Sequence, residues 1–167
     1  MDFPSPNGPV LPRDEVFLQY LDYSRERVIE KIAALPWDAL IVSVVPTDWT
    51  ALELVKHLTF VEMRWLEWGF EGQSVGEPWG DHVGDHWCIS PDDTRDSLLI
   101  GLRERGLRTR AIISRHGLDD LGQPGPRWDG AEPATLERVL FHLLLEYARH
   151  LGHLDVYAEL ADGPIGE

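Results

Sequence analysis

The residues best suited to chemistry lie on one helical stripe near the end of the chain. Between residues 136 and 157, apolar residues recur with the period of an α-helix. Steps of three and four along this segment define a single stripe, which consists of Val139, Leu143, Glu146, His150, His153 and Tyr157. The stripe begins and ends apolar, but its middle holds a carboxylate and two imidazoles. Because an uncompensated charge on a core-facing stripe is costly, we expect a partner for these groups.

A divalent metal ion is the simplest partner. Glu146 and His150 lie one helical turn apart, so both side chains can reach one ion, as in helix-borne zinc sites. A third ligand is available in the middle of a second apolar stripe, which consists of Leu54, His57, Leu58, Val61 and Trp65. If the two helices face each other, the set is His57, Glu146 and His150. Such a His/His/Glu set leaves room for water or substrate, which is typical of a catalytic zinc.

Each of these residues also has a simpler interpretation. A single histidine on an apolar face is often a hydrogen-bonded core residue, and His57 could be one. Glu146 could pair with Arg149 or with a neighbouring hydroxyl group. The coincidence of three such residues on two helices nevertheless favours a shared metal site.

Composition excludes several classes of partner. The 167 residues, 43% of them hydrophobic, predict a single domain over residues 1–167. The formal net charge of -14 argues against nucleic acid and anionic membranes as partners. The single cysteine, Cys88, excludes an internal disulfide, fits a cytoplasmic location and is expected to be a buried or half-buried thiol. We predict neither a signal peptide nor a membrane-spanning stretch.

The periodicity predicts an all-α fold with four long helices at about 14–34, 50–69, 90–117 and 135–163. The second helix opens on a capping box that begins at Thr50, and the third on a cap at Ser90 followed by proline and two acids. The β-branched run 41–45 has no partner strand, so it favours a connection or an extra helical turn. Four such helices with two long connections predict a four-helix bundle, in which facing helices build metal sites.

The two long connections are predicted to be loops. Residues 71–88 contain His82 and His86, but the glycine between them removes the helical spacing that would align them as ligands. A solvated loop held by its tryptophans is therefore favoured. Residues 119–133 are rich in glycine and proline, and their Trp128 is expected to fold back on the bundle. Tryptophans in or beside loops predict an aromatic pocket or a subunit interface: Trp37, Trp49, Trp79, Trp87 and Trp128.

Together these motifs resemble the DinB-like superfamily of small metal-binding four-helix proteins. The resemblance covers nearly the whole chain in the correct order. It implies a divalent metal, zinc or nickel, held by one histidine of the second helix and two residues of the fourth, which here are His57, Glu146 and His150. The motifs that carry it are Leu54-Val-Lys-His57 with Glu62, Arg64 and Trp65; Trp87 before Ser90-Pro-Asp-Asp-Thr94; and Glu146-Tyr-Ala-Arg-His150-Leu-Gly-His153-Leu-Asp155 with Asp162-Gly163.

One position within this resemblance points to thiol chemistry. Many members of the superfamily have histidine at the position of Glu146. The mycothiol-dependent maleylpyruvate isomerase has glutamate there, so this chain is similar to it at that position. That isomerase has a second, C-terminal domain and this sequence ends at Glu167, so we do not expect isomerisation of maleylpyruvate itself. What the resemblance implies is a metal that binds a low-molecular-weight thiol such as mycothiol, lowers its pKa and presents it to an electrophile. It also favours a homodimer.

His153 matches no ligand position of the superfamily. We expect it beside a ligand or at the edge of the pocket, where it is the nearest candidate for a general base. Three functions fit these expectations. They are a metal-dependent thiol S-transferase acting on a small electrophile in detoxification or stress, a non-catalytic metal-binding stress protein, and a metal-dependent hydrolase. Dependence on an added thiol discriminates among them.

Overall fold

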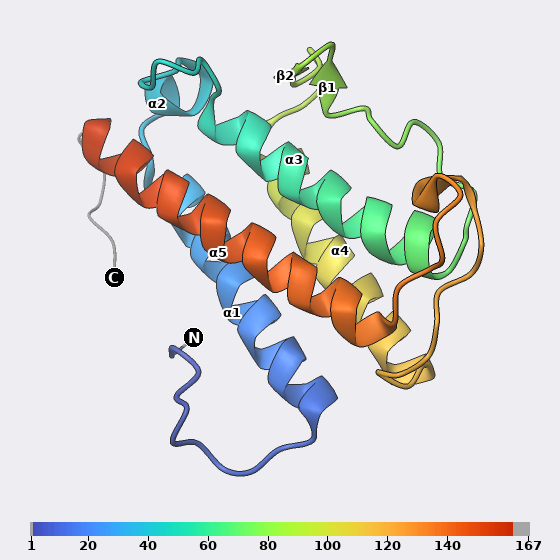
Figure 1. Cartoon of the computed structure of the whole chain (residues 1–167). Helices are drawn as coiled ribbons and strands as arrows, with labels where there is room; N and C mark the ends of the chain where they lie inside the picture. The colour runs from blue at the N-terminus through green and yellow to red at the C-terminus, as the bar shows by residue number, and fades with distance from the viewer. Residues whose placement is uncertain (1, 162–167) are drawn as a thin grey trace.

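The computed structural model describes residues 2–161, in which four long helices form a bundle (Figure 1). This confirms the predicted all-α fold. The long helices are α1 (Arg13–Ala34), α3 (Ala51–Glu62), α4 (Arg95–Arg115) and α5 (Leu136–Leu160). Short elements fill the connections: α2 (Trp37–Ile41), the antiparallel pair β1 (His82–Val83) and β2 (His86–Trp87), and the 3₁₀ turn η2 (Pro126–Trp128). No helix among the described residues is both long and apolar enough to cross a membrane.

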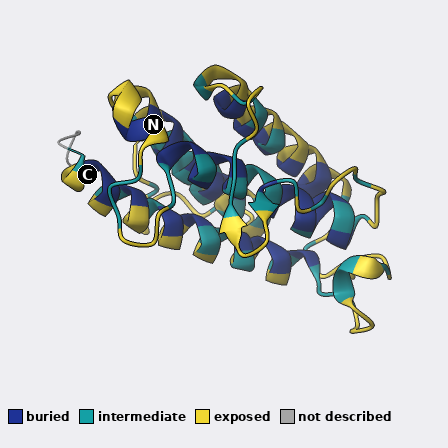
Figure 2. Cartoon of the chain, turned by 90° about the horizontal axis from the view of Figure 1, so that it is seen from above, coloured by how far each residue is buried: buried dark blue, intermediate teal, exposed yellow. Residues whose placement is uncertain are grey.

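Buried residues line the inward faces of the helices, and exposed residues line the outward faces (Figure 2). Helix α1 packs mainly against α5, and α3 packs against α4 and α5. Because α3 and α5 face each other, their apolar stripes meet in the core, as the sequence periodicity predicted. The fully buried core includes Leu21, Val28 and Ile32 of α1, Leu54 and Leu58 of α3, Leu102 and Ile112 of α4, and Leu140, Leu143 and Leu154 of α5.

The predicted helix starts near residues 14, 50 and 135 are confirmed, and the one at residue 90 is wrong. Thr50 caps α3 in a complete capping box with Glu53, and Thr135 caps α5. The third helix starts later than Ser90, because Thr94 caps α4 in a reciprocal box with Ser97. Residues 90–93 instead close as a turn, in which the Asp93 carboxylate accepts a hydrogen bond from the backbone N–H of Ser90.

Other boundaries also differ from the sequence prediction. The second helix does not stay α-helical to its end, because α3 continues into the π-helix η1 (Met63–Phe70). The run 41–45, by contrast, forms no strand, as expected: Ile41 ends the short helix α2, and a connection follows from Val42. Helix α4 ends at Arg115 rather than at residue 117. The predicted end of the last helix at residue 163 and the motif Asp162-Gly163 lie outside the described residues.

A buried polar network joins the four long helices. The Arg25 guanidinium of α1 donates to both carboxylate oxygens of Glu62 at 2.9–3.1 Å. The hydroxyls of Thr109 in α4 and Tyr147 in α5 donate to the same carboxylate. Burial and the nearby Glu62 charge raise the pKa of Tyr147 well above its usual value, so the phenol stays protonated as a donor. Gly106 leaves room for Arg25, since a Cβ there would lie 2.7 Å from the guanidinium carbon.

Candidate metal centre

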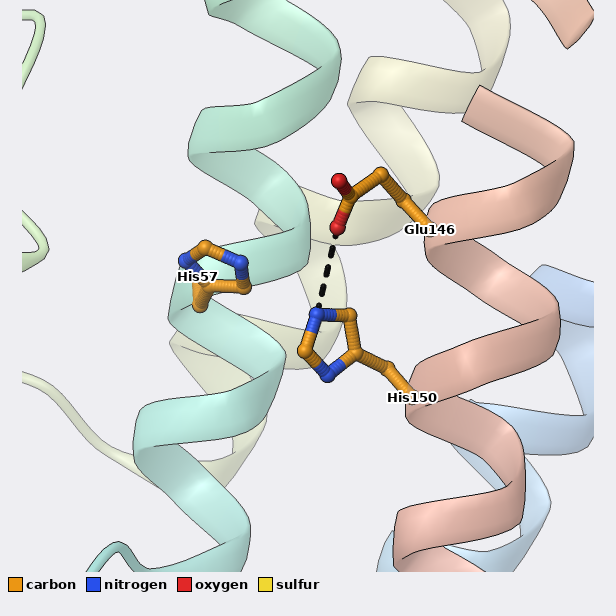
Figure 3. Close-up of side chains that lie close together, drawn as sticks. All are labelled: His57, Glu146 and His150. Atoms are coloured by element: carbon orange, nitrogen blue, oxygen red, sulfur yellow. Dashed lines mark ion pairs between the residues drawn. The ribbon is translucent and has the colours of Figure 1, made fainter. Parts of the chain in front are cut away.

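The facing sides of α3 and α5 bring His57, Glu146 and His150 together (Figure 3). One possible ligand atom from each residue lies within 4.8 Å of the other two. Nε2 of His150 is 3.2 Å from the nearer carboxylate oxygen of Glu146, and the rings of His57 and His150 have centroids 5.0 Å apart. The structure thus clusters the three residues that the sequence predicted as metal ligands. Metal binding itself stays a prediction.

The charge of this cluster suits a cation. Glu146 is a carboxylate, because its hydrogen bond with His150 and the neighbouring imidazoles lower its pKa. Its ion-pair partners within residues 2–161 are His142 at 3.3 Å and His150, with no arginine or lysine among them. The alternative pairing with Arg149 is therefore wrong. Two imidazoles and one carboxylate, which in residues 2–161 pairs with no arginine or lysine, are a donor set that fits a divalent ion such as zinc.

His57 is held by one contact at a ring nitrogen and another on the face of its ring. Its Nδ1 lies 3.0 Å from a carboxylate oxygen of Asp81, and its ring stacks on Trp87 with centroids 4.2 Å apart. Burial lowers the pKa of His57, which favours the neutral imidazole that binds metals. The side chain is only 12% exposed, so it can change orientation little.

Asp81 is one of the site residues that the sequence did not predict, as is His142. Asp81 is fully buried in a connection that the sequence predicted to be solvated. Burial alone would raise its pKa, but hydrogen bonds from His57 and Arg64, together with the adjacent His82 ring, outweigh that effect, so its pKa is lowered. Arg64 donates to the two carboxylate oxygens at 2.6 and 3.1 Å. An Asp-His pair was visible at positions 81–82, but nothing local indicated its burial.

The connection 71–88 is more ordered than predicted. Its β1–β2 hairpin places Trp87 on His57, which confirms that a tryptophan holds this segment on the bundle. His82 lies 2.9 Å from Asp81, whereas His86 is exposed. Cys88 is half-buried, as the sequence predicted.

Aromatic rings surround the cluster. On one side, Trp87 contacts His150 at 5.4 Å between centroids, and Trp49 lies 6.3 Å from His153. On the other side, Trp65 lies 4.5 Å from the ring of His142 and 6.1 Å from that of Trp128. Trp128 therefore folds back on the bundle as predicted. The predicted aromatic pocket or subunit interface stays a prediction; of its tryptophans, Trp37 and Trp79 are 57% and 50% exposed.

His153 lies at the edge of the cluster. Its ring centroid is 5.4 Å from that of His150, and the residue is exposed. Partial burial, together with the neighbouring His150 and Arg149, lowers the pKa of His153, which favours the neutral imidazole. This location matches the expectation that His153 lies beside a ligand rather than among the ligands.

Comparison with known proteins identifies the family to which this chain belongs. A search of curated proteins finds no match to the chain. The family model described as mycothiol S-transferase matches residues 16–163, a range that contains His57, Glu146 and His150. Since the match covers most of the sequence and nearly the whole bundle, the chain belongs to the mycothiol S-transferase family, within the DinB-like superfamily.

Proposed function

We propose that this protein is a divalent-metal-dependent mycothiol S-transferase that joins the thiol to a small electrophilic substrate in detoxification or stress defence. Membership of the family supports S-transfer with mycothiol in general. The convergence of His57, Glu146 and His150 is the observation that carries the metal dependence. We propose zinc or nickel as the ion.

The three residues have distinct tasks in this proposal. His57 and His150 offer neutral nitrogen donors, and Glu146 offers a negatively charged oxygen that reduces the net charge of the loaded centre. A divalent ion held by these residues would supply Lewis acidity, which would lower the pKa of a bound thiol and make its sulfur nucleophilic at neutral pH. Trp87 supports His57 from one face of its ring, and His142 steadies Glu146 through its contact with one oxygen.

The proposed reaction forms one carbon–sulfur bond. The thiol sulfur supplies the electron pair of the new bond to the electrophilic carbon. In a substitution, the bond to the leaving group breaks and its electron pair departs with that group. In an addition, the double bond opens and its far carbon takes up a proton. In both cases the thiol proton must pass to a base, for which His153 is the candidate.

His153→Ala is expected to lower kcat/KM by about 10²–10⁴-fold if His153 accepts this proton. Because a neutral imidazole is the base and its pKa is below the ordinary 6.5, wild-type activity falls as the pH falls through that pKa. The variant should lose this acidic limb, measured in kcat/KM against pH. His116→Ala, a histidine packed on Phe70 away from the cluster, is the control. Full activity with an unchanged pH profile would exclude His153 as the base.

An apolar cavity beside the centre supports a small electrophile with an apolar body. The cavity measures about 630 Å³ and lies between the first part of α1 and the first part of α5. Its lining includes Val16, Phe17, Phe141 and Leu145, and also His142, whose Nε2 lies 3.3 Å from Glu146 of the cluster. We propose that the electrophile binds here with its reactive carbon toward Glu146.

Leu145→Arg is expected to raise KM for an apolar electrophile by about tenfold, because a charge replaces apolar lining worth roughly 1–3 kcal/mol. The side chain is 57% exposed, so folding should be unaffected. Steady-state kinetics with each substrate varied in turn would measure this effect, and KM for the thiol should not change. An identical substitution at the exposed Leu107 of α4 is the control. An unchanged KM for the electrophile would show that the electrophile does not bind in this cavity.

Turnover that requires both metal and mycothiol would support the proposed function. The metal-free protein, the zinc-loaded protein and the nickel-loaded protein would each be incubated with a bimane electrophile, with and without mycothiol. We expect the S-conjugate only when metal and thiol are both present, and none with His57→Ala. Consumption of hydrolysable substrates without thiol would instead indicate a metal-dependent hydrolase. Bound metal without turnover across a panel of electrophiles would indicate a non-catalytic metal-binding protein.

A further inference from the structure

His57 belongs to two clusters of potential metal ligands. One is shared with Glu146 and His150, and the other with Asp81 and His82. Figure 3 shows one ring nitrogen of His57 directed toward Glu146 and His150 and the other directed away from them. Since Nδ1 is the nitrogen that contacts Asp81, Nε2 is left for the first cluster. The two clusters therefore use opposite sides of one imidazole.

Electrostatics distinguishes the two clusters. Arg64 donates to one oxygen of Asp81 at 2.6 Å and to the other at 3.1 Å, so the carboxylate already has a cation. The guanidinium is itself fixed, because it donates to the backbone oxygen of Pro78 and lies 4.4 Å from the ring centre of Trp79. A second cation between Asp81 and His82 would lie against this buried charge. The Asp81 cluster is thus suited to orient His57 rather than to hold an ion.

We propose that Asp81 is a positioning residue that fixes the tautomer and orientation of His57, so that Nε2 presents its lone pair to the metal centre. This inference rests on the proposed function, because it concerns the ion proposed there. Ion-paired with Arg64, Asp81 can only accept hydrogen bonds, so Nδ1 of His57 must donate. A neutral imidazole has one N–H, and Nε2 is consequently an acceptor. Trp87 restrains the same ring by stacking at an interplanar angle of 20°.

The first test needs no metal. In metal-free wild-type protein, ¹⁵N NMR of the histidine rings should show His57 with a protonated Nδ1 and an unprotonated Nε2. The His57→Gln spectrum would provide the assignment. A His57 ring with the proton on Nε2 would overturn the proposal. Because this measurement uses the wild-type chain, it is decisive even if variants of the buried Asp81 fail to fold.

The second test measures zinc affinity. Asp81→Asn is expected to bind zinc about 10–100-fold more weakly than wild type, the loss typical of removing a carboxylate behind a ligand histidine. Asp22→Asn is the matched control, because Asp22 is also an aspartate paired with arginines, and its ion-pair partners within residues 2–161 are Arg25 and Arg110. Competition with a chromophoric zinc chelator would give the affinities, and circular dichroism would check folding.

The outcomes separate this inference from the proposed function. Equal zinc affinity of wild type and Asp81→Asn would overturn the role of Asp81 and leave the metal centre intact. A second equivalent of zinc that is lost with Asp81 would overturn it too, because Asp81 would then be a ligand. Wild-type protein that binds no zinc would contradict the metal centre instead, and the ring NMR would still decide whether Asp81 sets the tautomer of His57.

Discussion

Glu146→Gln and His57→Ala are each expected to remove the metal from the purified protein. Glu146 supplies the only charge of the predicted ligand set, and glutamine keeps its size but not its charge. His57 supplies the only ligand from α3, so without it the remaining two lie on one helix. We expect each affinity loss to exceed the 10–100-fold typical of residues behind the ligands. Mass spectrometry of tag-free protein should find near one metal per wild-type chain and almost none in either variant.

The control for this prediction lies on the same helix. Glu137 is an acidic residue of α5 that pairs with Arg13 at the surface, so Glu137→Gln should keep the metal. A wild-type protein that is purified without metal and takes up neither zinc nor nickel would contradict the prediction. In that case the cluster would be a set of hydrogen-bonded polar residues, and the aromatic rings around it would be the place to search for a ligand.

Arg25→Met is expected to reduce the free energy of unfolding by about 3–5 kcal/mol. Arg25 and Glu62 are 4% and 1% exposed, and methionine fills part of the arginine volume without providing a donor. Among residues 2–161, the buried Glu62 carboxylate would then keep the hydroxyls of Thr109 and Tyr147 as its hydrogen-bond partners. The cost arises from this uncompensated charge, which must stay desolvated or take up a proton. Denaturant unfolding of the metal-free protein would measure the change.

A surface pair provides the comparison. Arg110 pairs with Asp22 and its side chain is 50% exposed, so Arg110→Met should cost no more than about 1 kcal/mol. The double variant Arg25→Met/Glu62→Leu should recover much of the lost free energy of unfolding, because it removes the buried Glu62 charge together with Arg25. If Arg25→Met cost no more than Arg110→Met, water would be reaching Glu62 and the network would not be the buried link between helices described above.

The sequence alone determined the features that depend on neighbours along one helix. The spacing of Glu146 and His150 fixes their common direction, because side chains four residues apart lie on one face. The Thr50 cap is equally local, since its partner is Glu53. The sequence also indicated that His57 faces Glu146 and His150, because the apolar stripes of two helices must meet in a bundle. Where local signals competed, as at Ser90 and Thr94, the sequence prediction was wrong because both residues offer a cap.

Only the tertiary structure decided the features that depend on contacts between distant segments. The burial of Asp81 results from Arg64 and His57, which lie 17 and 24 residues away along the chain. The spacing of residues along the sequence cannot predict such a contact, because a loop has no regular repeat that would show which of its side chains point inward. The buried charge of Glu62 likewise requires Arg25 from another helix. Helical spacing thus predicted the residues of the candidate centre, whereas the fold alone determined the partner that holds His57 in place.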